Sequence, residues 1–302
     1  MAEGTPPNGH AEHPHHAPPV VPGLSAFAGE YDLILCDVWG VVHNGVAAFP
    51  AACAALGRAR AGGASVILVS NAPRPNGFVR DMLDRFGVPR SAYDAIVTSG
   101  DVTRDVLAAR PGARMFHLGP PRDVGTFEGL DLTLAPLAEA DVVVCTGLLD
   151  DDTETPDDYR GQLNEMKARA VPLICANPDL VVEKGDKLIY CAGAIAEAYE
   201  KIGGEAIWCG KPYPAIYATA LTRGEALRGG PIDRSKVLGI GDALRTDIAG
   251  ANDAGFDSLF ISSGIHAHEL KSIDGAVPDT ASLAALFTGH AHPRGVMPRL
   301  AW

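Results

Sequence analysis

Short apolar runs that stop at a polar side chain constrain this chain more than any other feature. Residues 33–36 form one such run and lead directly into Asp37, and residues 237–240 form another that leads into Asp242. In an open α/β sheet, the carboxyl ends of parallel strands meet along one edge, at the crevice where ligands bind. We therefore expect Asp37, Asp242 and the nearby Asp247 to surround a single point.

Clustered Asp side chains at such an edge indicate a site for a hard cation. Mg²⁺ prefers oxygen ligands and keeps several waters, which suits one or two carboxylates together with a substrate phosphate. An Asp beside the cation is also placed to attack phosphorus and form an aspartyl-phosphate. Taken alone, an Asp after an apolar run is more commonly a turn former or a helix N-cap, so the cation site needs support from other strand ends.

Two further strand ends carry groups suited to a phosphate. Residues 66–69 lead into Ser70 and Asn71 ahead of a predicted helix, where free main-chain N–H groups and the helix dipole favour anions. Lys211 follows the apolar residues 206–209 and precedes a proline-started helix, so it can reach back towards a phosphate as a point charge. For each site taken singly, an ordinary turn or a solvated surface lysine is the simpler explanation.

Taken in order along the chain, these pieces resemble the four motifs of the haloacid dehalogenase superfamily. The matching segments are Asp37-Val38-Trp39-Gly40-Val41, Ser70-Asn71, Gly210-Lys211-Pro212 and Gly241-Asp242 with Thr246-Asp247. The resemblance extends over about residues 31–265 and includes Asn177-Pro178-Asp179. The long insertion between the second and third motifs points to the class IIA branch, which includes p-nitrophenylphosphatase-like and pyridoxal phosphate phosphatase-like enzymes.

The resemblance implies a role for each matching position. Asp37 would be the nucleophile and a magnesium ligand, the main-chain carbonyl of Trp39 and the side chain of Asp242 would complete the protein ligands, and Asp247 would act from behind them. The residues implied to hold the transferring phosphoryl group are Ser70, Asn71 and Lys211. Such a set is coherent, because phosphoryl transfer depends chiefly on positioning and on neutralising the equatorial oxygens.

One position departs from the superfamily pattern. Phosphatases of the superfamily carry a second Asp two residues after the nucleophile, in a DxDG sequence, whereas this chain reads DVWG and has Trp39 there. Indole has no acceptor and does not titrate, and loss of general acid–base catalysis costs about 10² to 10⁴ in rate. Acyl and aryl phosphates, which have good leaving groups, would suffer least. His43 is a candidate replacement because its unperturbed pKa lies near 6.5, although a loop histidine that only contacts substrate or solvent is the simpler reading.

Two classes of function follow from these residues. The first is a Mg²⁺-dependent phosphohydrolase that acts on a small phosphorylated metabolite, such as a sugar phosphate, a nucleotide or a cofactor phosphate, through an aspartyl-phosphate. The alternative is a catalytically weak relative that binds a phosphorylated ligand as a sensor or interaction module, which Trp39 favours. The enzyme is favoured by the retained motif residues, namely Asp37, Ser70, Lys211, Asp242 and Asp247, because a decayed site would be expected to lose its metal ligands too.

The length and the alternation of patterns predict the domain organisation. At 302 residues the chain exceeds the usual size of one hydrophobic core. Strand-like runs alternate with helical patterns, which predicts an α/β fold with a doubly wound, mostly parallel sheet and an inserted α/β cap. The expected parts are a flexible Pro/His-rich tail over residues 1–24, a core over 25–106 and 206–289, a cap over 107–205 and a C-terminal tail over 290–302. The apolar Met297, Leu300 and Trp302 are expected to dock on the core or on another subunit, which leaves a homo-oligomer open.

Composition indicates which binding partners and which cellular compartment to expect. The formal net charge is −12, which argues against nucleic acid, because binding a phosphate backbone needs a basic face. No stretch reaches the roughly 18 apolar residues that a membrane helix needs, so no membrane partner is expected. The six cysteines form no CxxC pair, and the amino terminus lacks a secretory signal pattern, so we expect a cytoplasmic protein with reduced thiols.

Overall fold

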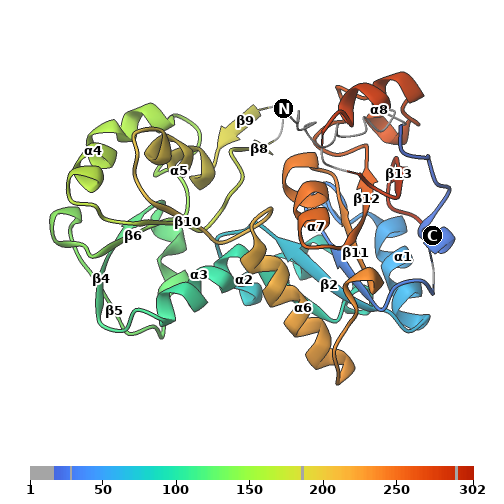
Figure 1. Cartoon of the computed structure of the whole chain (residues 1–302), viewed down its shortest axis with the longest axis horizontal. Coiled ribbons are helices and arrows are strands. Elements are labelled where there is room, and N and C mark those ends of the chain that lie inside the picture. The colour runs from blue at the N-terminus through green and yellow to red at the C-terminus, as the bar shows by residue number, and fades with distance from the viewer. Residues whose placement is uncertain (1–16, 28, 185–186, 290–291) are drawn as a thin grey trace, which may run out of the picture.

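Two mostly parallel sheets carry nearly all the strands of the chain (Figure 1). This computed structural model describes residues 17–27, 29–184, 187–289 and 292–302. One sheet has six strands in the order β13-β12-β11-β1-β2-β3, and the other has five in the order β10-β7-β6-β4-β5. The doubly wound α/β architecture with an inserted second α/β unit, predicted from the sequence, is confirmed.

The six-stranded sheet brings the predicted strand ends together. Its strands are β1 (Leu33–Cys36), β2 (Ser65–Ser70), β3 (Ala95–Thr98), β11 (Val237–Gly241), β12 (Asp257–Ile261) and β13 (Gly295–Met297). All six run parallel, and Cys36 of β1 lies opposite Ile240 of β11 and Leu68 of β2. The residues that follow these three strands therefore emerge side by side at one edge.

Helices cover both faces of this sheet, which explains why its central strand is apolar throughout. The helices of the core are α1 (Pro50–Ala61), α2 (Asn76–Phe86), α3 (Ser99–Ala108), α6 (Pro214–Arg228), α7 (Ala249–Asp253) and α8 (Thr280–Leu286). In β1, Ile34 and Cys36 pack in the hydrophobic cluster that contains α1 and α2 side chains. Leu33 and Leu35 point to the opposite face, into the cluster that contains α3 and α6.

The second sheet belongs to the insertion. Its strands are β4 (Ala113–Leu118), β5 (Leu132–Leu134), β6 (Val142–Cys145), β7 (Leu173–Cys175) and β10 (Ala206–Trp208). Helices α4 (Arg160–Ala168) and α5 (Ala192–Lys201) pack on one face, and a separate antiparallel hairpin is formed by β8 (Val181–Lys184) and β9 (Lys187–Tyr190). The opposite face shares a hydrophobic cluster with the core, through residues such as Val144 and Ile174.

Three boundaries differ from the sequence-based expectation. The strand at residues 206–208, which we expected in the core, pairs with β7 and so extends the second sheet beyond residue 205. Residues 295–297, expected in a tail, pair with β12 as an edge strand of the core sheet. Val20 forms a bridge with Val296, so part of the expected N-terminal tail is also attached. The histidines of that tail, His10, His13, His15 and His16, lie outside the described residues.

The apolar C-terminal residues are packed into the core. Met297 and Leu300 are 1% and 2% exposed and belong to the cluster that contains α1 and α2. Within the described ranges, no helix is long and apolar enough to cross a membrane.

Replacing Met297 by Ala should destabilise the fold, because it leaves a cavity beneath the edge strand. We expect the free energy of unfolding in urea to fall by about 2–5 kcal/mol. The control is Val277→Ala at a residue that is 64% exposed, where the change should stay within about 0.5 kcal/mol. Equal stability of the two variants would mean that the C-terminal segment does not contribute to the core.

Candidate active site

A cavity of about 440 Å³ opens at the carboxyl edge of the six-stranded sheet. Asp37 after β1, Ser70 at the end of β2 and Asp242 after β11 all line it. Lys211 and Asp247 line the same cavity, although they come from the segment after β10 and from the π-helical turn Leu244–Ile248. The structure therefore gathers these predicted residues at one place.

Three carboxylates form the acidic floor of this cavity. Asp37, Asp242 and Asp247 each offer an oxygen, and these atoms all lie within 4.8 Å of one another. Burial raises the pKa of Asp37 to about 7, although the ammonium of Lys211 acts in the opposite direction. Burial and the charges of its neighbours also raise the pKa of Asp242. An all-oxygen donor set with excess negative charge fits Mg²⁺, which would stabilise the ionised carboxylates.

Glycines allow the main chain to close around Asp242. A Cβ atom at Gly40 would lie 2.2 Å from Asp242 Oδ2, and one at Gly264 would lie 1.8 Å from the same atom. The main-chain N–H of Ile265 donates to that oxygen at 2.9 Å. Because Gly40 packs against Asp242, the main chain of Trp39, whose carbonyl the family resemblance makes a magnesium ligand, lies beside the carboxylates.

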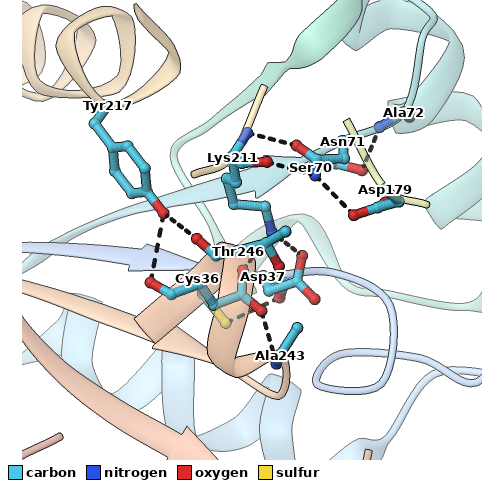
Figure 2. Close-up of polar contacts among 11 residues, drawn as sticks. Cys36, Asp37, Ser70, Asn71, Ala72, Asp179, Lys211, Tyr217, Ala243 and Thr246 are labelled. Atoms are coloured by element: carbon cyan, nitrogen blue, oxygen red, sulfur yellow. Dashed lines mark hydrogen bonds and ion pairs between the residues drawn. The ribbon is translucent and has the colours of Figure 1, made fainter. Parts of the chain in front are cut away.

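Lys211 joins two of the carboxylates. Its Nζ donates to Asp37 Oδ1 at 2.5 Å (Figure 2) and to Asp247 Oδ1 at 2.6 Å. Only 6% of the Lys211 side chain is exposed. Burial by itself would lower the pKa of Lys211, but the charges of Asp247 and Asp37 outweigh it and hold the pKa well above the ordinary value. Lys211 is therefore a fixed positive charge at the floor of the cavity.

The side chain of Asn71 positions Lys211 (Figure 2). Asn71 Oδ1 accepts the main-chain N–H of Lys211 at 2.7 Å, and Asn71 Nδ2 donates to the carbonyl of Lys211 at 3.1 Å and to Asp179 at 2.9 Å. Both amide hydrogens are thus engaged. Only the main chain of Asn71 therefore remains available to bind a phosphoryl group. The Ser70 hydroxyl accepts the N–H of Ala72, and its own hydrogen remains available to donate to a phosphoryl oxygen.

Asp247 is held by the turn that carries it. Its second oxygen accepts the N–H of Ala243 at 3.1 Å. Tyr217 of α6 donates its hydroxyl to the carbonyl of Thr246 at 2.8 Å, which ties this turn to the helix that follows Lys211. The turn that carries Asp247 is therefore held by the helix that begins three residues after Lys211.

The structure argues against His43 as a proton donor near neutral pH. Its ring is fully buried, and burial lowers its pKa to about 4. Nδ1 accepts the N–H of Gly45 at 2.8 Å, so the neutral ring carries its proton on Nε2, which has no hydrogen-bond partner among the described residues. The expectation relied on an unperturbed pKa, which the sequence could not correct for burial.

Asp179 is a site residue to which the sequence assigned no role. It lies after β7 in the insertion, lines the cavity and accepts the hydrogen bond from Asn71. Burial raises the pKa of its carboxyl. Arg245 donates to the carbonyl of Pro178 at 3.1 Å, so the same loop also contacts the turn after β11. The Asn177-Pro178-Asp179 sequence was the available signal, but its spacing does not reveal where the insertion returns to the core.

Comparisons with known proteins identify related families and chains. Residues 34–133 match the haloacid dehalogenase-like hydrolase family, and residues 208–283 match the HAD-hydrolase-like family. Ribonucleotide monophosphatase NagD of Escherichia coli K12 is 26% identical over 239 residues, which cover 77% of this chain and 88% of that protein. D-glycerol 3-phosphate phosphatase of Mycobacterium tuberculosis is 28% identical, over 80% of this chain and 66% of that protein.

A solved structure extends the likeness to almost the whole chain. It is a haloacid dehalogenase-like hydrolase from Brucella suis 1330, 47% identical, with a TM-score of 0.81 over 92% of this chain and 98% of that one. With both halves of the core matching the family and a NagD-like insertion between them, this chain belongs to the haloacid dehalogenase-like hydrolases of class IIA.

Proposed function

We propose that this protein is a Mg²⁺-dependent phosphohydrolase that acts on a small phosphorylated metabolite. The observation that carries the proposal is the bridge of Lys211 between Asp37 and Asp247, beside Asp242, at the floor of one cavity. This arrangement offers a carboxylate nucleophile, a cation site and a fixed positive charge within reach of one phosphoryl group. Relatives that are named as phosphatases of a ribonucleotide and of glycerol phosphate support the same chemistry.

Each residue has a defined task in this proposal. Asp37, Asp242 and the carbonyl of Trp39 would hold Mg²⁺, with Asp247 behind them, and the ion would neutralise charge on the phosphoryl oxygens. Lys211 neutralises a further share of that charge. The hydroxyl of Ser70 donates to a phosphoryl oxygen.

The reaction proceeds in two displacements. In the first, an Asp37 oxygen bonds to phosphorus, the bond from phosphorus to the leaving oxygen breaks, and its electron pair departs on that oxygen. In the second, a water oxygen bonds to phosphorus and the Asp37 carboxylate leaves; one proton of the water stays on the inorganic phosphate and the other passes to solvent, which in turn supplies the proton that the departed leaving oxygen takes up. Overall, one phosphate ester and one water become one alcohol and one phosphate.

The second candidate, a sensor that binds a phosphorylated ligand without turnover, rests on Trp39 in place of the usual acid. A panel of acyl, aryl and alkyl phosphates assayed with and without Mg²⁺ distinguishes the two. Mg²⁺-dependent release of phosphate from any of them supports the enzyme. Mg²⁺ binding without release from any of them supports the sensor.

Replacing Asp242 by Asn should weaken Mg²⁺ binding and abolish turnover, because a neutral amide loses the charge that holds a hard cation. Calorimetric titration with Mg²⁺ measures the affinity, and phosphate release measures turnover. Asp274→Asn, at a side chain that is 95% exposed, is the matched control and should bind the ion as the native protein does. Native affinity in Asp242→Asn would show that the cation binds elsewhere.

Replacing Lys211 by Met should reduce kcat/KM by more than tenfold, or over about 1.4 kcal/mol of transition-state stabilisation. The variant removes a positive charge that contacts Asp37, while Mg²⁺ binding should persist. Steady-state kinetics with the best substrate of the panel give the ratio, and thermal melting shows whether the fold is intact. Unchanged kinetics in a folded variant would exclude Lys211 from the reaction.

Replacing Trp39 by Asp should increase hydrolysis of alkyl phosphates such as glycerol 3-phosphate, because it restores a group able to protonate the leaving oxygen. The native protein should act far better on acetyl phosphate than on glycerol 3-phosphate. Melting temperature is measured alongside activity, since the smaller side chain removes packing. The missing-acid explanation is wrong if the native protein cleaves glycerol 3-phosphate at about 1 to 10³ per second.

A further inference from the structure

The indole of Trp39 is held in place at the cavity by the side chains and main chain around it. Gly45 lies against the ring, since a Cβ atom there would come within 2.3 Å of Trp39 Cη2. The ring of His43 meets the indole edge-to-face, with centroids 5.3 Å apart and planes at 81°, and His43 in turn packs on Phe86 at 4.9 Å. The main-chain N–H of Gly45 donates to His43 Nδ1, which links the two residues that pack against the indole.

Despite this packing, Trp39 is 44% exposed and lines the cavity. A large aromatic ring that is held in place and still accessible costs little entropy to use as a contact surface. His43, which is neutral and buried, then acts as a positioning residue for the indole.

Apolar side chains also line other parts of the cavity. The larger apolar side chains among them include Phe49, Met82, Val181, Val182 and Ile265. Among the described lining residues, Lys211 is the one group with a positive charge near neutral pH, and it already contacts two carboxylates. The other charged lining residues are all aspartates. A second anionic group on the substrate would therefore meet aspartates and no further positively charged side chain of the described lining, whereas an uncharged apolar group would contact apolar side chains.

We propose that Trp39 is the binding surface for the leaving group, and that the substrates are phosphate monoesters of aromatic, phenol-like hydroxyl groups with no second anionic group. This inference rests on the proposed phosphohydrolase function and adds the substrate class to it.

The chemistry of an aryl ester suits a site without an acid. When Asp37 attacks phosphorus, the electron pair of the breaking P–O bond leaves on an aryl oxide, whose conjugate phenol has a pKa of about 10. This anion is stable enough to depart without a proton from the enzyme and is protonated by solvent afterwards. An alkoxide is far more basic and needs the acid that Trp39 has replaced.

The inference is tested with three substrates that share the phosphoryl group and differ in the leaving group. These are 2-naphthyl phosphate, which has a ring and a good leaving group; acetyl phosphate, which has a good leaving group alone; and glycerol 3-phosphate, which has neither. For the native protein with Mg²⁺, we expect kcat/KM for 2-naphthyl phosphate to exceed that for glycerol 3-phosphate by more than a hundredfold.

Variants then separate ring binding from leaving-group chemistry. Trp39→Ala should lower kcat/KM for 2-naphthyl phosphate by about tenfold or more, mainly through KM, and change that for acetyl phosphate less than threefold. Trp39→Phe should recover much of the loss. Val46→Ala is the matched control, because Val46 is in the same loop, is 79% exposed and does not line the cavity, and it should behave as the native protein.

The results also separate the two proposals. Equal losses for 2-naphthyl and acetyl phosphate in Trp39→Ala would overturn the inference, because the indole would then serve only to hold the loop. Equal native activity on the naphthyl and glycerol esters would overturn it too. Either outcome leaves the phosphohydrolase function standing, whereas a native protein that releases no phosphate even from acetyl phosphate would refute both.

Discussion

Repulsion among buried carboxylates is the constraint on which this site depends. Two unit charges 4 Å apart interact by about 4 kcal/mol at an effective dielectric constant of 20, and Asp37, Asp242 and Asp247 bring three acidic groups to within 4.8 Å. Lys211 contacts two of them but supplies only one positive charge. Burial is the main cause of the raised pKa of Asp37, and the negative charge of Asp247 adds to it. The remaining negative charge is what the proposed divalent cation would neutralise.

The position of that lysine depends on both sheets. Lys211 follows β10, an edge strand of the second sheet, and its main chain is held by Asn71, which follows β2 of the first. Asn71 also binds Asp179, which enters the site after β7 of the second sheet. One amide group therefore couples the floor of the cavity to two segments of the insertion. A shift of the second sheet would move the lysine as well as the cavity wall.

The sequence predicted those features that local pattern and strand direction determine. Helix α2 begins where a helix was predicted after Ser70 and Asn71, and β1 and β11 place Asp37 and Asp242 at one edge because fully apolar runs belong between two covering layers. Features that depend on packing were missed. The burial of His43 could not be predicted from its position in a loop. The hydrogen bond between the Asn71 side chain and Lys211 was also missed, because these residues are 140 positions apart in the sequence. The membership of β10 in the second sheet depends likewise on its pairing with β7.

The same electrostatic constraint gives Trp39 a physical rationale. A carboxylate at that position would add a fourth acidic group to a turn where Gly40 already packs against Asp242. The indole adds no charge, so it avoids that repulsion, and the loop through Gly45 and His43 is shaped to hold its ring. The exchange removes a proton donor and supplies an aromatic surface in its place. Without an acid, the site does not protonate the leaving oxygen. In our proposal, it selects instead an aromatic leaving group that departs without a proton.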